Sequence, residues 1–222
     1  MPSILAHIIY TIKNPVEYLG PELYLGAQGP DVFFYANETD YISVGTALHK
    51  LKSTEYKELM KNFPKSFYYG YISHMKLDEK LHPLINSYYS EPIQHTKFEY
   101  NFDELLSLKL FGIHFIEHKW WKILEVKNIE KISKEFDKML KKEFKIRNVS
   151  YEYAYKKMLK NLRILFELPY FKKNILAKIL KYIGKDYTYL FPNIEDNDIN
   201  KLSHIEKEFF SILKISGRES NQ

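Results

Sequence analysis

Histidine and carboxylate side chains recur at a spacing of four residues in YISHMKLDEKLHPLINSYYSEPIQHTKFE, residues 71–99. His74 and His82 each lie four residues from Asp78, and His95 lies four residues before Glu99. Side chains four apart lie one above the other on a helix, so each pair would present an imidazole and a carboxylate on one face. Imidazole and carboxylate are suitable zinc ligands in a chain without cysteine. The stretch therefore predicts metal sites built on helices.

Three further candidates precede this stretch, namely His7, Asp31 and His49. A lone histidine near apolar residues is more often a core residue than a ligand. An aspartate in a Gly-Pro turn, as at Asp31, is usually a turn or capping residue. One His-x-x-x-Asp pair is also weak evidence, because ion pairs on a helix surface are common. Two such pairs, with more histidines before and between them, favour a metal site much more strongly.

His114 and His118 are also four residues apart. No carboxylate follows them at a matching spacing, and they neighbour Trp120 and Trp121. We therefore interpret both histidines as structural or interfacial. His204 is interpreted as a surface residue.

The elements that must position these side chains are predicted to be helices, because apolar residues recur three and four apart along most of the chain. The predicted helices cover residues 3–13, 41–63, 65–80, 93–111, 129–144, 150–168, 171–183 and 196–213. Ser3 is the expected N-cap of the first, and His82-Pro83 is expected to end the third. Residues 112–127 fit either helix or strand. We predict an all-α, single-domain multi-helix bundle around a zinc cluster, spanning residues 1–216, with a disordered tail at 217–222.

The amino-acid composition excludes several classes of function. The 222 residues include no cysteine, which excludes disulfides, thiolate metal sites and a cysteine nucleophile. No apolar run approaches the length of a membrane span, so we expect no transmembrane segment. The first residues, MPSILAHIIYTIKNP, lack a basic leader and a small-residue cleavage site, so we expect a cytoplasmic protein.

The net charge of +5 is distributed unevenly. Residues 1–111 carry 10 basic and 13 acidic groups, a balance of −3, whereas residues 112–222 carry 23 and 15, a balance of +8. A lysine-rich, solvated helical surface explains this excess without any partner. The alternative is attraction to anionic lipid headgroups or to nucleic acid. Charge alone leaves both interpretations open.

The order His…Gly-Pro-Asp…His…His-x-x-x-Asp-x-x-x-His…His-x-x-x-Glu resembles the zinc-dependent phospholipase C family, also called the phospholipase C/D domain. The S1/P1-type nucleases share that all-helical zinc scaffold. The resemblance rests on LGAQGPDVFFY, the segment around His49, YISHMKLDEKLHP and HTKFE. It covers residues 1–112 and leaves residues 113–216 as a basic helical remainder.

The resemblance implies two or three zinc ions. The ligands of one would be His49, His74 and Asp78. The ligands of a second would be His82, His95 and Glu99. A third would take His7, share the bridging Asp78, and use the amino terminus, here the amine of Pro2 if the initiator methionine is removed. Asp31 would be the catalytic residue that orients or deprotonates the attacking water.

The function implied is hydrolysis of a phosphoric diester by a metal-activated water, with phospholipase C-type cleavage as the leading activity. The substrate would be a phospholipid or another phosphodiester, and peripheral contact with an anionic membrane surface would fit the basic second half. A nuclease or other phosphodiesterase on the same metal cluster is one alternative. A metal-binding or interaction protein without turnover is another.

Overall fold

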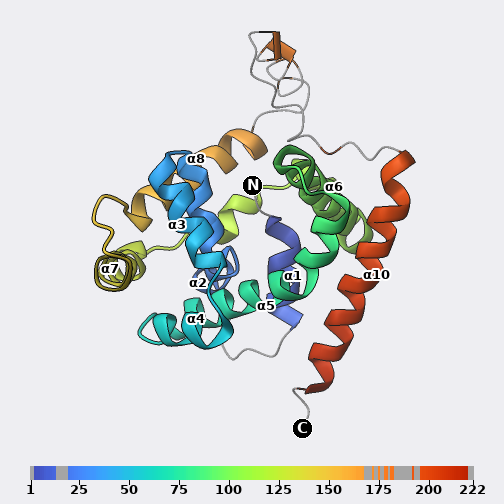
Figure 1. Cartoon of the computed structure of the whole chain (residues 1–222). Helices are drawn as coiled ribbons and strands as arrows, with labels where there is room; N and C mark the ends of the chain where they lie inside the picture. Colours follow the sequence, from blue (N-terminus) through green and yellow to red (C-terminus); the bar gives the residue numbers. More distant parts are fainter. Residues whose placement is uncertain are drawn as a thin grey trace. The chain divides into compact units, whose positions relative to one another are not determined.

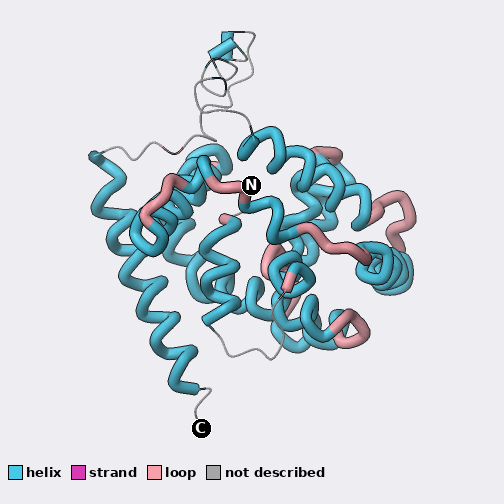
Figure 2. Tube along the Cα trace, turned by 180° about the vertical axis from the view of Figure 1, so that it is seen from behind, coloured by secondary structure: helices cyan, strands magenta, loops and turns pink. Residues whose placement is uncertain are grey.

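The computed structural model describes residues 3–13, 20–167 and 196–219, together with single positions between 172 and 192. In these residues every regular element is a helix and no strand occurs (Figures 1 and 2). The all-α fold class is therefore confirmed. Within the same residues, no helix has the combination of length and apolar character that crossing a membrane requires.

The elements include α-helices, three 3₁₀ helices (η1 to η3) and one π-helix (η4). In chain order they are α1 (Ile4–Lys13), α2 (Pro21–Gly26), η1 (Gly29–Ala36), α3 (Thr39–His49), α4 (Ser53–Met60), α5 (Lys65–Tyr88), α6 (Pro92–Phe111), η2 (Phe115–Glu117), η3 (Trp120–Leu124), α7 (Ile129–Met139), η4 (Leu140–Phe144), α8 (Tyr151–Glu167) and α10 (Asp196–Glu219).

Two predicted helix boundaries are wrong. The predicted helix at residues 41–63 is two helices, α3 and α4. The Glu55 carboxylate accepts the backbone N–H of Lys52 at 2.6 Å, which satisfies a donor at the start of α4 and favours a new helix there. The helix predicted to end at Pro83 continues to Tyr88 with the proline inside it. Leu81 and Ile85 are buried on either side of Pro83, and this packing holds the helix together despite the lost hydrogen bond.

In the second half, the helices predicted at residues 129–144, 150–168 and 196–213 are helical where they are described, but the predicted start of the tail is wrong. Residues 112–127, which fitted either helix or strand, form the two short helices η2 and η3. The predicted helix at residues 171–183 lies outside the continuously described ranges. Helix α10 reaches Glu219, so the tail predicted from residue 217 begins inside this helix, and residues 220–222 lie outside the described residues.

The chain divides into two compact units. The first contains Val16–Lys76 and Trp121–Leu162, and the second contains Pro2–Pro15, Leu77–Trp120 and Arg163–Gln222. Helix α5 begins in the first unit and ends in the second. The prediction that residues 1–216 form one domain stays a prediction.

An aromatic cluster forms the core of the first unit. The Phe136 ring stacks on Tyr151, with 4.1 Å between the ring centroids, and meets Phe63 edge-on at 4.7 Å. Helix α2 approaches α5 so closely that a Cβ atom on Gly70 would lie 2.1 Å from the carbonyl oxygen of Leu23. This contact holds α2, and the η1 segment that follows it, against the first half of α5.

In the second unit α1 packs on α6, and α10 packs on both. Phe102 of α6 meets Phe209 of α10 edge-on, with 5.5 Å between centroids. One turn earlier Phe98 stacks on Tyr89 at 4.8 Å. These contacts fix the rotation of α6 about its axis and so the direction in which its polar side chains project.

Candidate metal centres

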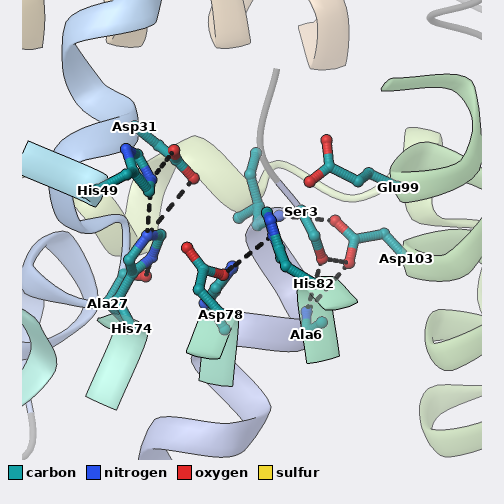
Figure 3. Close-up of polar contacts among 12 residues, drawn as sticks. Ser3, Ala6, Ala27, Asp31, His49, His74, Asp78, His82, Glu99 and Asp103 are labelled. Atoms are coloured by element: carbon teal, nitrogen blue, oxygen red, sulfur yellow. Dashed lines mark hydrogen bonds and ion pairs between the residues drawn. The ribbon is translucent and has the colours of Figure 1, made fainter. Parts of the chain in front are cut away.

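Asp31, His49 and His74 meet in the first unit, and we call them the first cluster (Figure 3). Nε2 of His49 lies 2.9 Å from Oδ1 of Asp31, and Nε2 of His74 lies 3.8 Å from Oδ2. The two Nε2 atoms are 3.4 Å apart. His74 is fully buried at 0% exposure. Three separate elements, η1, α3 and α5, therefore bring three ligand-type atoms to one point.

The backbone orients both imidazoles of the first cluster. Nδ1 of His74 lies 3.0 Å from the carbonyl oxygen of Ala27, and Nδ1 of His49 lies 2.7 Å from that of Gly45. A carbonyl oxygen only accepts hydrogen bonds, so each Nδ1 carries the proton that it donates. A neutral ring then has a lone pair on Nε2, directed at the Asp31 carboxylate. Metal-binding histidines are commonly held in this way.

This arrangement requires a positive charge. Two imidazole lone pairs and a carboxylate that converge within 4 Å repel one another unless a proton or a metal ion lies among them. The donors, two nitrogens and a carboxylate, are a set that binds zinc. The first cluster thus fits a metal ion by its geometry and by the chemistry of its donors.

Gly29 allows the Asp31 segment to reach His74. Its φ of +51° lies in the left-handed region that glycine adopts readily. A Cβ atom at this position would lie 2.4 Å from Cδ2 of His74. The predicted rigid Gly-Pro turn is the first turn of the 3₁₀ helix η1, and it carries Asp31 against the α5 histidine.

His82, His95 and Glu99 meet in the second unit, and we call them the second cluster. One ligand atom from each lies within 4.8 Å of the others. Nε2 of His95 is 3.4 Å from Oε1 of Glu99, and the two imidazole centroids are 5.2 Å apart. The His82 side chain is 33% exposed and that of His95 is 18% exposed. Solvent and a ligand can reach this cluster.

Asp78 also lies in the second unit, between two histidines. Its Oδ1 is 3.3 Å from Nε2 of His7 and 3.2 Å from Nε2 of His82. A cavity of about 20 Å³ is lined by these three side chains, by Glu99 and Ser3, and by neighbouring apolar residues. This volume suffices for one water-sized particle among polar groups.

Asp103 is a polar residue of this region that the sequence interpretation missed. Its carboxylate accepts the Ser3 hydroxyl at 2.5 Å and the backbone N–H groups of Ile4, Leu5 and Ala6 at 2.7, 3.1 and 3.0 Å (Figure 3). Burial raises the pKa of Asp103 to about 7, and the hydrogen bonds oppose that shift. The carboxylate caps the first turn of α1 from α6 and thereby positions the helix that carries His7.

Spacing could have identified Asp103, because it continues the series His95, Glu99 at the next helical turn. Ser3 also caps α1 as predicted, since its Oγ accepts the N–H of Ala6 at 3.3 Å. A cap contributed by a residue about one hundred positions away has no signature in the sequence of α1 itself.

The structure groups the predicted site residues partly as the resemblance implies. His82, His95 and Glu99 are together, and His7 meets Asp78. His49 and His74 are together, and the carboxylate that contacts them within the first unit is Asp31. The amine of Pro2, an expected ligand, lies outside the described residues. His114 bonds to Glu104, with 2.5 Å between Nδ1 and Oε1, which agrees with a structural role.

Comparisons with known proteins add no relative. No protein-family model, no curated protein and no solved structure matches the chain. The resemblance to the phospholipase C family therefore rests on the order and spacing of the residues named above.

Proposed function

We propose that this chain is a zinc-dependent phosphoric-diester hydrolase whose leading activity is phospholipase C-type cleavage. The observation that carries the proposal is the convergence of two backbone-oriented imidazoles, His49 and His74, on the Asp31 carboxylate. The second cluster supports it, because it offers the same donor set of two imidazoles and one carboxylate.

Zinc suits both clusters, because catalytic zinc sites often use two histidines and a carboxylate and leave a position for water. When bound, such an ion lowers the pKa of water and neutralises charge on the phosphoryl oxygens. Ferrous iron also takes two histidines and a carboxylate. Metal analysis of the purified protein decides between the two ions.

The side chains of the first cluster have separable roles in this proposal. His49 and His74 hold the ion through Nε2, and the carbonyls of Gly45 and Ala27 keep both rings in the required tautomer. Phe34 stacks on the His49 ring, with 5.5 Å between centroids, and limits its rotation. Asp31 has a second carboxylate oxygen, which can accept the proton of an attacking water.

In the second unit His82, His95 and Glu99 would hold a further ion, and Asp78 would link His82 to His7. A third ion at His7, with the amine of Pro2, remains part of the proposal.

The phospholipid substrate, the nuclease alternative and the cytoplasmic location rest on the sequence alone. A metal-binding protein without turnover is the outcome to exclude.

Metal content and hydrolysis test the proposal together. The purified protein should hold at least one zinc per chain, and it should hydrolyse bis(4-nitrophenyl) phosphate until a chelator is added. His74→Ala should lose the zinc of the first cluster together with hydrolysis, whereas His204→Ala, a histidine outside both clusters, should keep both. If the protein binds metal but does not hydrolyse the substrate, only the metal-binding role of the clusters is supported. Less than one metal ion per chain, together with no chelator-sensitive hydrolysis, would refute the proposal that this chain is a metal-dependent hydrolase.

A further inference from the structure

A row of lysines follows one face of α7 in the first unit and continues into η4. Its four side chains are exposed and spaced by three, four and three residues, so they lie on one side of the helix. They are Lys131, Lys134, Lys138 and Lys141. The opposite side packs into the core through Ile132 and Phe136, both of which are 0% exposed. We call the four lysines, together with the exposed Lys142, the lysine ridge.

The protein compensates the positive charge of the lysine ridge only weakly. Lys131 and Lys141 form no ion pair with any residue that the structure describes. Lys134 lies 3.9 Å from the carboxylate of Glu130, and its side chain is 79% exposed. An ion pair this exposed contributes little, because water solvates both charges. The ridge lysines are therefore available to pair with the carboxylates of a partner.

A pocket of about 340 Å³ opens beside the lysine ridge, between the end of α4 and the α7–η4 segment. Lys138 and Lys142 of the ridge line its rim, while Leu59, Phe63 and Met139 contribute apolar atoms. Phe63 and Met139 are 5% and 6% exposed, so the apolar part lies at the bottom. This volume is within the range of ligand pockets. One wall is the π-helix η4, a rare form that is frequent at functional sites.

We propose that the lysine ridge and this pocket bind an acidic segment of a partner protein. Carboxylates of the segment would pair with the ridge, and one large aliphatic side chain would enter the pocket. A helical segment suits the ridge, because glutamates three and four residues apart align on one helix face. The proposal involves neither metal cluster and requires no metal, so it can fail or succeed separately from the hydrolase.

Other polyanions fit this surface less well. Phe63 is the aromatic residue of the pocket lining, and at 5% exposure it offers little ring face on which a nucleic-acid base could stack. Glu135 and Glu143 also line the pocket and would repel a continuous row of phosphates, whereas a peptide can donate backbone N–H groups to them. A membrane is disfavoured because the apolar atoms lie in a pocket instead of projecting toward a bilayer.

Fluorescence anisotropy with a labelled peptide, in excess chelator, tests the proposal. The probe AEAAELAAEAAEA carries four glutamates at the spacing of the ridge and one leucine beside them. It should bind, and replacement of its leucine by alanine should weaken binding about tenfold, because less apolar surface is buried. Leu59→Gln should bind the two peptides equally, since it places a polar side chain in the pocket. Oligothymidylate and phosphatidylserine vesicles should bind more weakly than the probe.

The ridge has a matched pair of variants. Replacement of four ridge lysines by glutamine should weaken binding about thirtyfold, because each exposed ion pair contributes roughly a factor of two to three. This variant is Lys131→Gln, Lys134→Gln, Lys138→Gln, Lys141→Gln. The control changes four exposed lysines elsewhere in the same unit and should bind as wild type does. It is Lys50→Gln, Lys65→Gln, Lys156→Gln, Lys160→Gln. Both variants lose the same charge, so a difference between them reports on position.

Three results would overturn the proposal. They are equal weakening by the two quadruple variants, equal binding of the leucine and alanine peptides by wild type, and tighter binding of oligothymidylate or of vesicles than of the probe. If circular dichroism shows that the ridge variant is unfolded, Lys131→Gln, Lys134→Gln takes its place and should bind about fivefold more weakly. Probe binding by a protein without hydrolysis would support this inference and contradict only the hydrolase.

Discussion

The two clusters use the same ligand types but hold them differently. In the first cluster the carbonyls of Ala27 and Gly45 fix the two histidines from behind, and His74 is fully buried. In the second cluster His95 contacts Glu99 one helical turn away, and the partly exposed His82 contacts Asp78 in the same way. The first is a preorganised site, and the second is adjustable. We expect tighter metal binding at the first and faster exchange at the second.

The largest effect is expected from His74→Ala. Removal of a fully buried side chain leaves a cavity and leaves the carbonyl of Ala27 without its donor, so the free energy of unfolding should fall by roughly 4 kcal/mol. Urea unfolding in excess chelator measures this loss without any contribution from metal. If the variant is as stable as wild type under these conditions, His74 is not held in the buried, preorganised arrangement described for the first cluster.

The next largest effect is expected from Asp103→Asn, which places an amide against the N–H groups of α1 and should cost about 3 kcal/mol. Its pH dependence has a defined sign. The folded-state pKa is about 7 and the ordinary value is 3.8. Unfolding between these pH values therefore releases a proton, and wild type should lose stability as pH rises, by up to about 1.4 kcal/mol per pH unit.

Urea unfolding of both proteins between pH 4 and pH 7 checks this slope. The difference in stability between wild type and Asp103→Asn should shrink as the pH rises. Ser3→Ala is a useful companion, because it removes one of the hydrogen bonds and leaves the carboxylate; it should cost about 1 kcal/mol. A difference independent of pH would show that Asp103 is ionised throughout this range.

A smaller, more selective effect is expected from Gly29→Ala. The added methyl group meets the His74 ring, and the left-handed backbone is strained by a side chain, so stability should fall by about 2 kcal/mol. Zinc affinity of the first cluster should fall, whereas that of the second should not change. Titration calorimetry resolves the two affinities. An equal loss of zinc affinity at both clusters would mean that the substitution at Gly29 does not act on the first cluster alone.

The smallest effect on stability is expected from Glu99→Gln. It removes the carboxylate of the second cluster but keeps the shape of the side chain, so stability in chelator should change by less than about 1 kcal/mol. Metal affinity at this cluster should nevertheless fall at least about tenfold. Glu91→Gln, an exposed glutamate just before α6, serves as the control. Unchanged affinity in Glu99→Gln would exclude the second cluster as a metal site.

The same contrast explains what could be predicted from the sequence. Helical spacing predicted the local pairs of α5 and α6, because side chains four residues apart meet on any helix. It predicted the all-α class and most helix positions for the same reason. The contacts of Asp31 with His49 and His74, the orienting carbonyls and the Asp103 cap depend on how distant segments pack, which no local pattern records. The course of α5 through Pro83 likewise depends on burial on both sides of the proline.

Anomalous diffraction at the zinc absorption edge tests directly whether the first cluster binds zinc. Crystals of the purified protein should show one anomalous peak within bonding distance of Nε2 of His49 and of His74, beside the Asp31 carboxylate. A second peak is expected among His82, His95 and Glu99. If crystals soaked in zinc show no anomalous peak at the first cluster, the first cluster is not a zinc site.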